Sequence, residues 1–377
     1  MSNRVLHIIT GLATGGAETM LYKLLAAGLH ESDDVIVVSL WDKGVLGPDI
    51  EQLGIRVECL GMRRGVPSLA GIKRLRALVR EFGPQLIQGW MYHGDLAATI
   101  ARRWALPGTR LIWNVRNTLY ALKSEKILTR QVIRANRLLS SRVDGILYNS
   151  ELSRQQHQAF GFCANQSRVI GNGFDLAKFG PNKKAAAVLR ASLGIPMDAV
   201  VVGHVARFHP MKDHQGFLQA MKPLLSATPS LYLLMSGRGV ENSNPELTAS
   251  LRGLPMDRVC LLGEQRDTSP VFAAMDLFCL SSKWGEGFPN VLGEAMASGV
   301  PCVARDVGDS ATVLGNTGTI VPSGGLLQLT QAIENMVNVS TDERRVMATA
   351  GRERIADNYS IEAITDQYRQ FYQKVME

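Results

Sequence analysis

The feature that most constrains this chain is an alternation of short apolar runs with longer amphipathic stretches. The runs at Val5–Ile9 and Val35–Val38 consist almost entirely of Val, Ile and Leu. A parallel strand that helices cover on both faces needs such a run, whereas a half-exposed antiparallel strand alternates apolar and polar residues. The alternation therefore predicts an α/β fold built on parallel sheets.

This alternation runs through the chain twice. In the first half we expect strands at residues 4–10, 34–41, 55–60, 85–90, 110–115 and 144–149, and helices at 17–30, 69–82, 94–105 and 122–142. In the second half we expect strands at 200–205, 231–236, 258–262, 277–280, 300–304 and 319–321, with a helix near 214–225. The pattern predicts two Rossmann-like, doubly wound domains that face one cleft.

The chain length also favours two domains, because 377 residues are too many for one ordinary core. Turn residues at 171–175 and 180–181 mark a linker between the halves. We therefore expect a first domain at residues 1–171 and a second at 172–357. The remaining residues, 358–377, contain a helix at about 361–375 that is a candidate to cross back to the first domain.

Composition narrows the class of protein. Hydrophobic residues make up 46% of the chain and charged residues 20%, which is typical of a globular protein. No apolar run approaches the ~20 residues that span a bilayer, and Val5–Ile9 is too short for the apolar part of a secretion signal. The five cysteines are scattered and include no C-x-x-C pair. They suit a reducing cytosol and predict no structural zinc site.

The charge is unevenly distributed. Residues 1–175 hold 22 Lys and Arg against 14 Asp and Glu, whereas residues 176–377 hold 19 against 20. The whole positive excess of the chain therefore lies in its first half. Such an asymmetry indicates an anionic partner or surface for that half.

Ligands of open parallel sheets bind beyond the carboxyl ends of the strands, so the strand-to-helix corners hold the candidate site residues. At the first corner, Gly15 and Gly16 allow close approach to a ligand, and the following helix offers amide groups to an anion. The corner lacks the G-x-G-x-x-G pattern, so a nicotinamide site is not indicated. Taken alone, a structural turn explains it equally well.

The second corner, residues 281–299, carries the strongest signal. Pro289 suits a first helical turn and Gly299 a helix end, so amides near Asn290 and Val291 form a candidate diphosphate site. Glu286 precedes this helix, and Glu294 lies one turn into it. Two carboxylates beside a phosphate suit a ligand with neutral hydroxyl donors, such as a sugar and a ribose. Favourable charge near a helix N-terminus, worth ~0.3–1 kcal/mol, is the alternative explanation.

The third corner, residues 205–214, carries Arg207 and Lys212. A guanidinium and an ammonium at this position could both reach a leaving diphosphate. Taken alone, two solvated surface cations are the simpler explanation.

Together, these residues resemble the retaining nucleotide-sugar glycosyltransferases of family four (glycosyl transferases group 1), which have the GT-B fold. The resemblance rests on Arg207-x4-Lys212 and on Glu286-x7-Glu294 within the block at 286–299. The corner at 15–18 is similar to that family's first-domain loop, and residues 170–175 look like its interdomain segment. The match runs across essentially the whole chain.

The resemblance implies that the second domain holds a sugar nucleotide. Arg207 and Lys212 would contact the diphosphate, and Glu294 would bind ribose hydroxyls. Glu286 would hold the transferred sugar together with backbone amides from Gly287 to Asn290. Gly16 would approach the diphosphate from the opposite domain, and Arg238 and Arg266 would border the base. The expected donor-binding residues are Gly15, Gly16, Arg207, Lys212, Arg238, Arg266, Glu286, Gly287, Phe288, Pro289, Asn290, Val291 and Glu294.

His93 follows the strand expected at 85–90 and matches the first-domain histidine that the family places near the sugar. The chain lacks the H-x-H-x-P surroundings of many members, so we expect His93 to position the sugar and not to transfer a proton. A lone histidine of this kind is more often structural. The expected catalytic residues are Arg207, Lys212, Glu286 and His93.

Breaking a sugar–phosphate bond develops negative charge on the departing diphosphate, which cations and helix amides stabilise. Because Arg207 and Lys212 supply this countercharge and no D-x-D cluster occurs, we expect neither a metal nor another cofactor. The resemblance implies retention of anomeric configuration. The expected reaction moves a hexose or N-acetylhexosamine from a nucleoside-diphosphate sugar, with UDP favoured over GDP, to a lipid-linked glycan in polysaccharide or lipopolysaccharide assembly.

Two expected helices carry rows of basic residues. The first row is Lys73, Arg76 and Arg80, and the second is Lys126, Arg130, Arg134 and Arg137. Solvated helix faces are the commonest explanation for such rows. With the positive excess of this half, they favour an anionic surface, so we expect peripheral attachment to the inner face of the cytoplasmic membrane and a polyprenyl-diphosphate-linked acceptor. Arg116 and Asn117, at another strand end, are candidates to line the acceptor site.

Three alternatives stay open at this point. Nucleic acid is a lesser candidate partner, because no binding module is recognisable. A two-domain sugar-nucleotide epimerase shares the expected architecture, but only His93 offers itself as an acid or base. A non-catalytic sugar-nucleotide-binding subunit would also have this fold. Product analysis with donor alone and with donor plus acceptor separates these readings.

Overall fold

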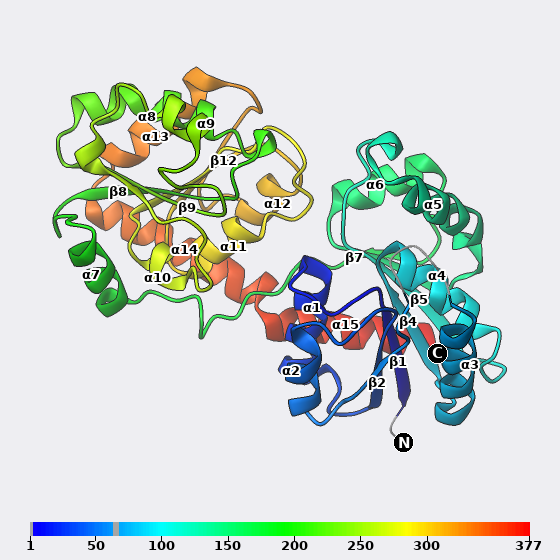
Figure 1. The fold of residues 1–377 in the computed structure, drawn as a ribbon. Helices are drawn as coiled ribbons and strands as arrows, with labels where there is room; N and C mark the ends of the chain where they lie inside the picture. Colours follow the sequence, from blue (N-terminus) through cyan, green and yellow to red (C-terminus); the bar gives the residue numbers. More distant parts are fainter. Residues whose placement is uncertain (1–2, 63–67) are drawn as a thin grey trace. The chain divides into compact units, whose positions relative to one another are not determined.

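The chain divides into two compact units (Figure 1), and the computed structural model describes residues 3–62 and 68–377. The first unit comprises Met1–Gly173 and Ile361–Glu377, and the second comprises Phe174–Ser360. These boundaries lie two and three residues beyond the expected ends at 171 and 357. Helix α15 (Ile361–Met376) is thus part of the first unit.

The first unit is built on a seven-stranded sheet with the order β3-β2-β1-β4-β5-β6-β7. Every strand pair in it is parallel. Its strands are β1 (Arg4–Ile9), β2 (Asp34–Ser39), β3 (Arg56–Cys59), β4 (Leu86–Trp90), β5 (Arg110–Val115), β6 (Gly145–Tyr148) and β7 (Ser167–Val169). The direction of winding reverses between β1 and β4, which is where such sheets bind ligands.

Helices cover both faces of this sheet (Figure 1). They are α1 (Gly16–Leu24), α2 (Leu46–Gln52), α3 (Leu69–Phe82), α4 (Met91–Arg102), α5 (Ile127–Leu139), α6 (Glu151–Phe160) and α15, with short helices η1 (Leu25–Leu29), η2 (Leu122–Ser124) and η3 (Ser140–Arg142). Helix α15 packs its apolar face into this unit. Tyr368 stacks on Trp90, with ring centroids 6.4 Å apart, and a Cβ at Gly145 would meet Phe371 at 2.6 Å.

The second unit has a six-stranded parallel sheet with the order β10-β9-β8-β11-β12-β13. Its strands are β8 (Val200–Val205), β9 (Leu231–Ser236), β10 (Val259–Leu261), β11 (Leu277–Leu280), β12 (Cys302–Arg305) and β13 (Thr319–Val321). Its helices are α7 (Lys183–Ser192), α8 (His214–Ala227), α9 (Pro245–Ser250), α10 (Ser269–Ala273), α11 (Asn290–Ala297), α12 (Ser310–Leu314), α13 (Leu326–Asn338) and α14 (Thr341–Tyr359), with short helices η4 (Pro210–Lys212) and η5 (Met256–Arg258). Winding reverses between β8 and β11.

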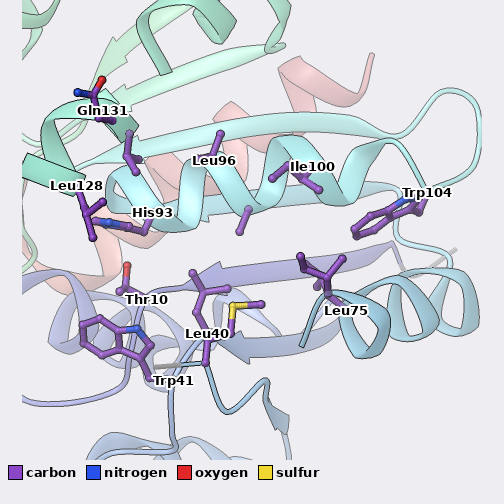
Figure 2. A pocket seen from close by; sticks show the side chains of 14 residues that line it. Thr10, Leu40, Trp41, Leu75, His93, Leu96, Ile100, Trp104, Leu128 and Gln131 are labelled. Atoms are coloured by element: carbon purple, nitrogen blue, oxygen red, sulfur yellow. The ribbon is translucent and has the colours of Figure 1, made fainter. Parts of the chain in front are cut away.

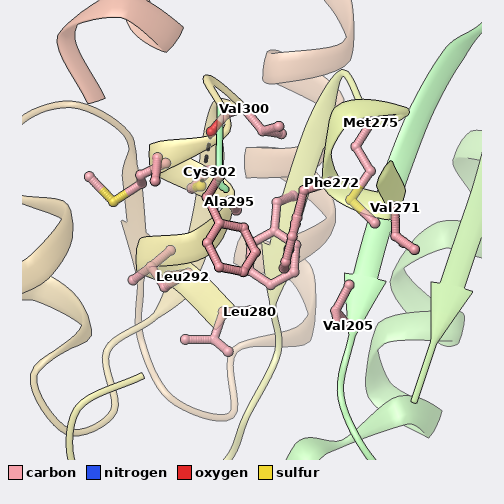
Figure 3. Packing of buried hydrophobic residues seen from close by; sticks show 14 of the residues in the cluster. Val205, Val271, Phe272, Met275, Leu280, Leu292, Ala295, Val300 and Cys302 are labelled. Carbon is pink, nitrogen blue, oxygen red and sulfur yellow. Dashed lines mark hydrogen bonds between the residues drawn. The ribbon is translucent and has the colours of Figure 1, made fainter. Parts of the chain in front are cut away.

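Successive residues of the second sheet pack into different cores, as the pleat requires. Val201 and Phe278 belong to a cluster with α10 and α11, whereas Val202 and Leu277 belong to a cluster with α8 and α13. Figure 3 shows the first of these clusters. The almost continuous apolar runs of the sequence are explained by this burial on both faces. Both sheets are wholly parallel and doubly wound, as predicted.

Several predicted boundaries were wrong. The helix expected at 94–105 begins at Met91, directly after β4. The helix expected at 17–30 changes to a π-type turn at Leu25 and ends near Gly28, whose φ is +83°. The helix expected at 122–142 is divided into η2, α5 and η3. Strand β12 begins at Cys302 and not at Val300, because the Val300 amide donates to the Ala295 carbonyl at the end of α11.

Candidate functional site

The predicted donor residues of the second unit lie on the two loops that flank its reversal point. Lys212 ends η4 in the loop after β8, and Glu286 lies in the loop after β11. Two hydrogen bonds join these loops: the Lys283 amide donates to the Met211 carbonyl at 2.8 Å, and the Ser281 hydroxyl donates to the Lys212 carbonyl at 2.8 Å. Both loops are therefore held together at the carboxyl edge of the sheet, where a ligand is expected.

Lys212 and Glu286 form an ion pair between Nζ and Oε1. The side chains are 14% and 9% exposed, so this pair is largely removed from water. The Ser282 hydroxyl also donates to Glu286 Oε1 at 2.5 Å. The ammonium group and the serine hydroxyl thus fix one carboxylate oxygen. The structure brings together two residues that the sequence separates by 74 positions.

A second buried ion cluster lies beside this pair. Asp213 Oδ2 contacts Arg305 Nη1 at 2.5 Å, and Asp213 Oδ1 contacts Lys283 Nζ at 2.8 Å. Arg305 also donates to the Ser281 carbonyl at 2.8 Å. Asp213 in addition caps α8 by accepting from the Gly216 amide. One carboxylate therefore fixes the start of α8, the end of β12 and the loop that follows β11.

Two histidines complete the buried polar layer. His204 Nε2 lies 2.9 Å from the Ser281 hydroxyl, and its ring centroid is 4.6 Å from that of His214. Burial lowers the pKa of His204 well below its usual value and the pKa of His214 to about 4. Both imidazoles are therefore neutral at pH 7, and they pack against each other in the protein interior.

Two positions of this site require glycine because neighbouring atoms approach the backbone closely. Gly285 has φ +83°, and a Cβ there would lie 2.0 Å from the Met211 sulfur. Gly308 has φ +62°, and a Cβ there would lie 2.4 Å from the Glu286 carbonyl oxygen. At both positions the left-handed conformation and the close approach favour glycine. The loop around Glu286 thus packs closely against the loop of Met211 and the loop of Gly308.

Helix α11 begins at Asn290, with Pro289 as its N-cap residue. The first N–H groups of a helix have no carbonyl partner inside it, so this turn presents amides to an anion. Phe288 is buried against Phe174 and Tyr359, with centroids 6.1 and 5.5 Å away. Gly287 accepts a hydrogen bond from the Asp309 amide. Val291 and Glu294 are half-buried, with Glu294 one turn beyond Asn290.

Three predicted arginines of the donor site are exposed. Arg207 follows β8, Arg238 follows β9, and Arg266 lies between β10 and α10. Within residues 3–62 and 68–377, none of their guanidinium groups has a hydrogen-bond or ion-pair partner. The Arg238 carbonyl accepts from the Phe208 amide, which ties the loop of Arg238 to that of Arg207. Their guanidinium groups are therefore available to an anionic ligand.

In the first unit, the predicted residues flank the reversal point between β1 and β4. Gly15 is the N-cap residue of α1, and a Cβ at Gly16 would meet no atom within 4 Å. Packing inside this unit therefore does not explain the glycine at position 16. His93 lies in the first turn of α4, half-buried, and burial lowers its pKa. The imidazole is therefore neutral at pH 7.

Arg116 does not belong to an exposed basic surface. It is buried, and it donates to the Tyr368 hydroxyl at 2.7 Å, to Asn114 Oδ1 at 3.3 Å and to Asn172 Oδ1. The guanidinium of Arg116 is therefore held inside the first unit. Arg116 and half-buried Asn117 do border a polar pocket of about 310 Å³ that Gly16, Glu18 and His93 also line.

The two basic rows differ in their surroundings. Lys73, Arg76 and Arg80 are exposed on α3. On α5, by contrast, Arg130 donates to the carbonyls of Glu125 and Lys123. Arg137 lies over the Phe160 ring at 5.5 Å, and Arg134 donates to Gln131 at 3.4 Å. On α5, therefore, the guanidinium groups of Arg130 and Arg137 already make contacts within the unit, whereas Lys126 before this helix is exposed.

Sequence reasoning missed several residues of the second-unit site. Asp213 directly follows the predicted Lys212, and it precedes an apolar helical pattern as an N-cap residue does. Ser282 lies four residues before the predicted Glu286. Arg305 ends an apolar strand and gives no local signal of its partner. Among the residues that the structure describes, no group of three or more His, Cys, Asp or Glu side chains is arranged to hold a metal ion. No helix in the same ranges is long and apolar enough to cross a bilayer.

Comparison with known proteins identifies the family. The family profile described as Glycosyltransferase Family 4 matches residues 14–178, and the profile described as Glycosyl transferases group 1 matches residues 199–338. EpsF of Bacillus subtilis (strain 168) is 29% identical over 315 residues, which cover 80% of this chain and 79% of that protein. The lipopolysaccharide core biosynthesis glycosyltransferase LpsE of Rhizobium meliloti (strain 1021) is 35% identical over 205 residues, or 54% of this chain and 56% of LpsE.

Among solved structures, Anabaena Alr3699/HepE in complex with UDP superposes with a TM-score of 0.82 at 23% identity, covering 99% of this chain and 100% of that one. The fold and these matches define a glycosyltransferase with the GT-B fold, as predicted. The chain belongs to the glycosyltransferases of the family-four type, whose two domain profiles between them match most of its length.

Proposed function

We propose that this enzyme is a retaining, metal-independent glycosyltransferase that uses a nucleoside-diphosphate sugar, with UDP favoured over GDP. The transferred group is a hexose or N-acetylhexosamine, and the acceptor is a lipid-linked glycan. The observation that carries the proposal is the Lys212–Glu286 pair at the carboxyl edge of the second sheet, with exposed Arg207 on the same loop as Lys212. The pair combines a cation for a phosphate with a carboxylate for sugar hydroxyls.

Lys212 serves as a fixed cation for the diphosphate. An ammonium group has three N–H donors, so Lys212 can remain paired with Glu286 and also donate to a phosphate oxygen. Arg207 adds a guanidinium fork that matches phosphate geometry. As the sugar–phosphate bond breaks, negative charge grows on the leaving diphosphate, and cations already in position lower the barrier. These two cations provide the countercharge that a metal supplies in other transferases.

Glu286 serves as the acceptor for sugar hydroxyls. A carboxylate has about four lone-pair positions, so it accepts from Lys212, from Ser282 and from sugar hydroxyls at the same time. The buried contacts orient the carboxylate before the sugar arrives. Glu294, one turn into α11, is the proposed partner for ribose hydroxyls. Arg238 and Arg266 border the base.

Retention of configuration is proposed from family membership and from the placement of the carboxylates. Glu286 and Glu294 lie on one loop and the helix that follows it. A glycosidase pair flanks the scissile bond instead. We therefore propose that the acceptor hydroxyl attacks from the face that the diphosphate leaves, with the leaving phosphate taking the proton. His93 positions the sugar as a neutral hydrogen-bonding group.

Relatives support the proposed substrates. HepE is described in complex with UDP, and also with UDP-glucose. LpsE is a lipopolysaccharide core biosynthesis enzyme. These names favour a UDP sugar and a role in polysaccharide or lipopolysaccharide assembly. The exposed row Lys73, Arg76 and Arg80 supports attachment to the anionic inner face of the cytoplasmic membrane, where a polyprenyl-diphosphate-linked acceptor would be found.

The test is transfer by Arg207→Ala with Arg252→Ala as the matched control, because Arg252 is an exposed arginine of the same unit. We expect Arg207→Ala to lower kcat at least ~100-fold and Arg252→Ala to leave it unchanged. Product analysis with donor alone and with donor plus lipid acceptor accompanies the assay. Normal turnover in folded Arg207→Ala, or an epimerised donor in place of an extended acceptor, would overturn the proposal.

A further inference from the structure

An apolar cavity of about 330 Å³ begins at the carboxyl edge of the first sheet and runs along α4. Figure 2 shows its walls, which include Leu40, Trp41, Leu75, Leu96, Ile100 and Trp104. Its remaining lining residues are also apolar, apart from Thr10, His93 and Gln131. Cavities of this volume, mostly apolar with a few polar groups at one end, are typical of small-molecule sites.

The cavity continues into the polar pocket of the first unit. Thr10 and His93 line both spaces. Along α4 the cavity extends from His93 to Trp104, which is about 16 Å of helix at 1.5 Å per residue. The other lining residues of the polar pocket include Glu18, Arg116 and Asn117. A single ligand with a polar head and an apolar tail would therefore fill both spaces, with the junction at His93.

The rim of the cavity includes exposed apolar side chains, and one of the helices that forms its wall carries exposed basic residues. Leu128 is 57% exposed and Ile100 is 41% exposed, and both line the cavity. Helix α3, which supplies Ile72 and Leu75 to the wall, carries the exposed basic row Lys73, Arg76 and Arg80 on its other residues. An apolar opening beside cations suits a chain that enters from an anionic bilayer.

We propose that this cavity binds the first part of the isoprenoid chain of a polyprenyl-diphosphate-linked acceptor. The acceptor's head lies in the polar pocket at His93, and the rest of the chain leaves past Leu128 toward the bilayer. The volume admits one hydrocarbon chain and not the two or more chains of an acylated lipid. The charged residues among those that line the polar pocket are Glu18, Arg116 and Glu125. The exposed cations Lys73, Arg76 and Arg80 lie on α3, which forms one wall of the cavity. This inference rests on the proposed transferase function.

The test measures binding of farnesyl diphosphate by equilibrium dialysis, without any bilayer. Leu128→Asp places a charge at the rim of the cavity. Leu138→Asp is its matched control, because Leu138 is 70% exposed on the same helix and does not line the cavity. We expect Leu128→Asp to weaken binding at least ~10-fold and Leu138→Asp to change it less than ~2-fold. Inorganic diphosphate should bind far more weakly than farnesyl diphosphate.

A second variant, Ala97→Trp, places a large side chain in the cavity from α4. It tests the inference if the isoprenoid chain still fits beside Asp at position 128. Equal affinity of both variants and the wild type for farnesyl diphosphate would overturn the inference. Equal affinity for dodecyl phosphate, which has a straight chain, would also overturn the isoprenoid assignment. UDP uptake is measured in parallel. Failure of the wild type to take up UDP would count against the proposed function, whereas normal UDP uptake without farnesyl diphosphate binding would count against this inference alone.

Discussion

The two units share one topology and differ in what their sheets carry at the carboxyl edge. In the second unit this edge holds two buried ion pairs, Lys212–Glu286 and Asp213–Arg305. In the first unit the corresponding edge holds a polar pocket lined by Glu18 and buried Arg116, and the start of an apolar cavity. Exposed cations of this unit lie on helices such as α3. The same arrangement of strands thus supports different chemistry. The fold provides the place, and the loop residues decide what binds there.

This difference matches the two substrates of a transferase. Charges that are buried and already paired stay fixed, so they stabilise charge that develops in a reaction. An apolar cavity adds binding energy through contact area and has no such preference for a transition state. We therefore expect changes at the second edge to affect kcat and changes at the first edge to affect acceptor KM.

The largest expected effect is on catalysis at the second edge. Lys212→Met removes the cation beside Glu286, and we expect kcat to fall ~1,000-fold, or about 4 kcal/mol in activation free energy. Lys222→Met is the control, because Lys222 is an exposed lysine on α8. Steady-state transfer assays measure both variants. If Lys212→Met raised only the acceptor KM and left kcat unchanged, the assignment of kcat effects to the second edge and KM effects to the first would be contradicted.

The next effect is on stability. Arg305→Leu leaves Asp213 buried with only Lys283 as an ionic partner. Loss of one member of a buried pair costs about 3–5 kcal/mol, and we expect about 3 kcal/mol in unfolding free energy because Lys283 remains. Urea denaturation measures the change, with exposed Arg252→Leu as the control. A loss below about 1 kcal/mol would mean that the cluster does not hold these loops in place.

The third prediction concerns a property that the units share. Burial lowers the pKa of His7 to about 3 and of His157 to about 4 in the first unit, as it lowers the pKa of His204 and His214 in the second. Below about pH 6.5 the unfolded chain binds protons that the folded chain does not, so stability is complete above that pH and falls as the pH drops toward 4.

For His157 we expect about 2 kcal/mol of unfolding free energy to be lost between pH 6.5 and pH 5, at about 1.4 kcal/mol per pH unit. Its Nδ1 donates to the Ser153 carbonyl at 2.7 Å, so Nε2 accepts from the Tyr92 hydroxyl at 2.8 Å, and protonation of Nε2 removes the acceptor of this second bond. His157→Gln should flatten the pH dependence of urea midpoints. An unchanged slope in that variant would contradict the assignment.

The smallest effect is expected at the outer surface of the first unit. Arg76→Gln removes one exposed cation of α3, and we expect affinity for anionic vesicles to fall by about 1 kcal/mol. Lys184→Gln, an exposed change on α7 of the second unit, should have no effect. Co-sedimentation with vesicles at two salt concentrations measures both. Equal losses in the two variants would mean that the basic rows do not select a membrane-facing side.

The comparison also explains what the sequence could predict. The core strands were predicted well, because a strand that is buried on both faces has a continuous apolar run. Helix α3 was predicted well, because a helix with one buried face has apolar residues at helical spacing. Residues of the second-unit site occur in compact motifs, so Lys212, Glu286 and Glu294 could be named. Their mutual contacts could not, because the partner of Lys212 lies 74 residues away.

The apolar cavity could not be predicted at all. Its lining residues, such as Trp41, Leu75 and Leu128, come from separate loops and helices and read locally as ordinary core residues. The start of α4 was also missed, because Trp90 provides no side-chain cap and Met91 has φ +62°, an uncommon conformation that no sequence pattern indicates. Arg116 was named only as a candidate for the acceptor site, because the fold alone brings Tyr368 beside it.

Binding of UDP without a metal is measured by calorimetric titration in the presence of EDTA. We expect uptake at one site, a large loss of affinity in Arg207→Ala and Lys212→Met, and unchanged affinity in Leu128→Asp. Absence of uptake by the wild type, or equal affinity in the wild type and Lys212→Met, would contradict the proposed donor site.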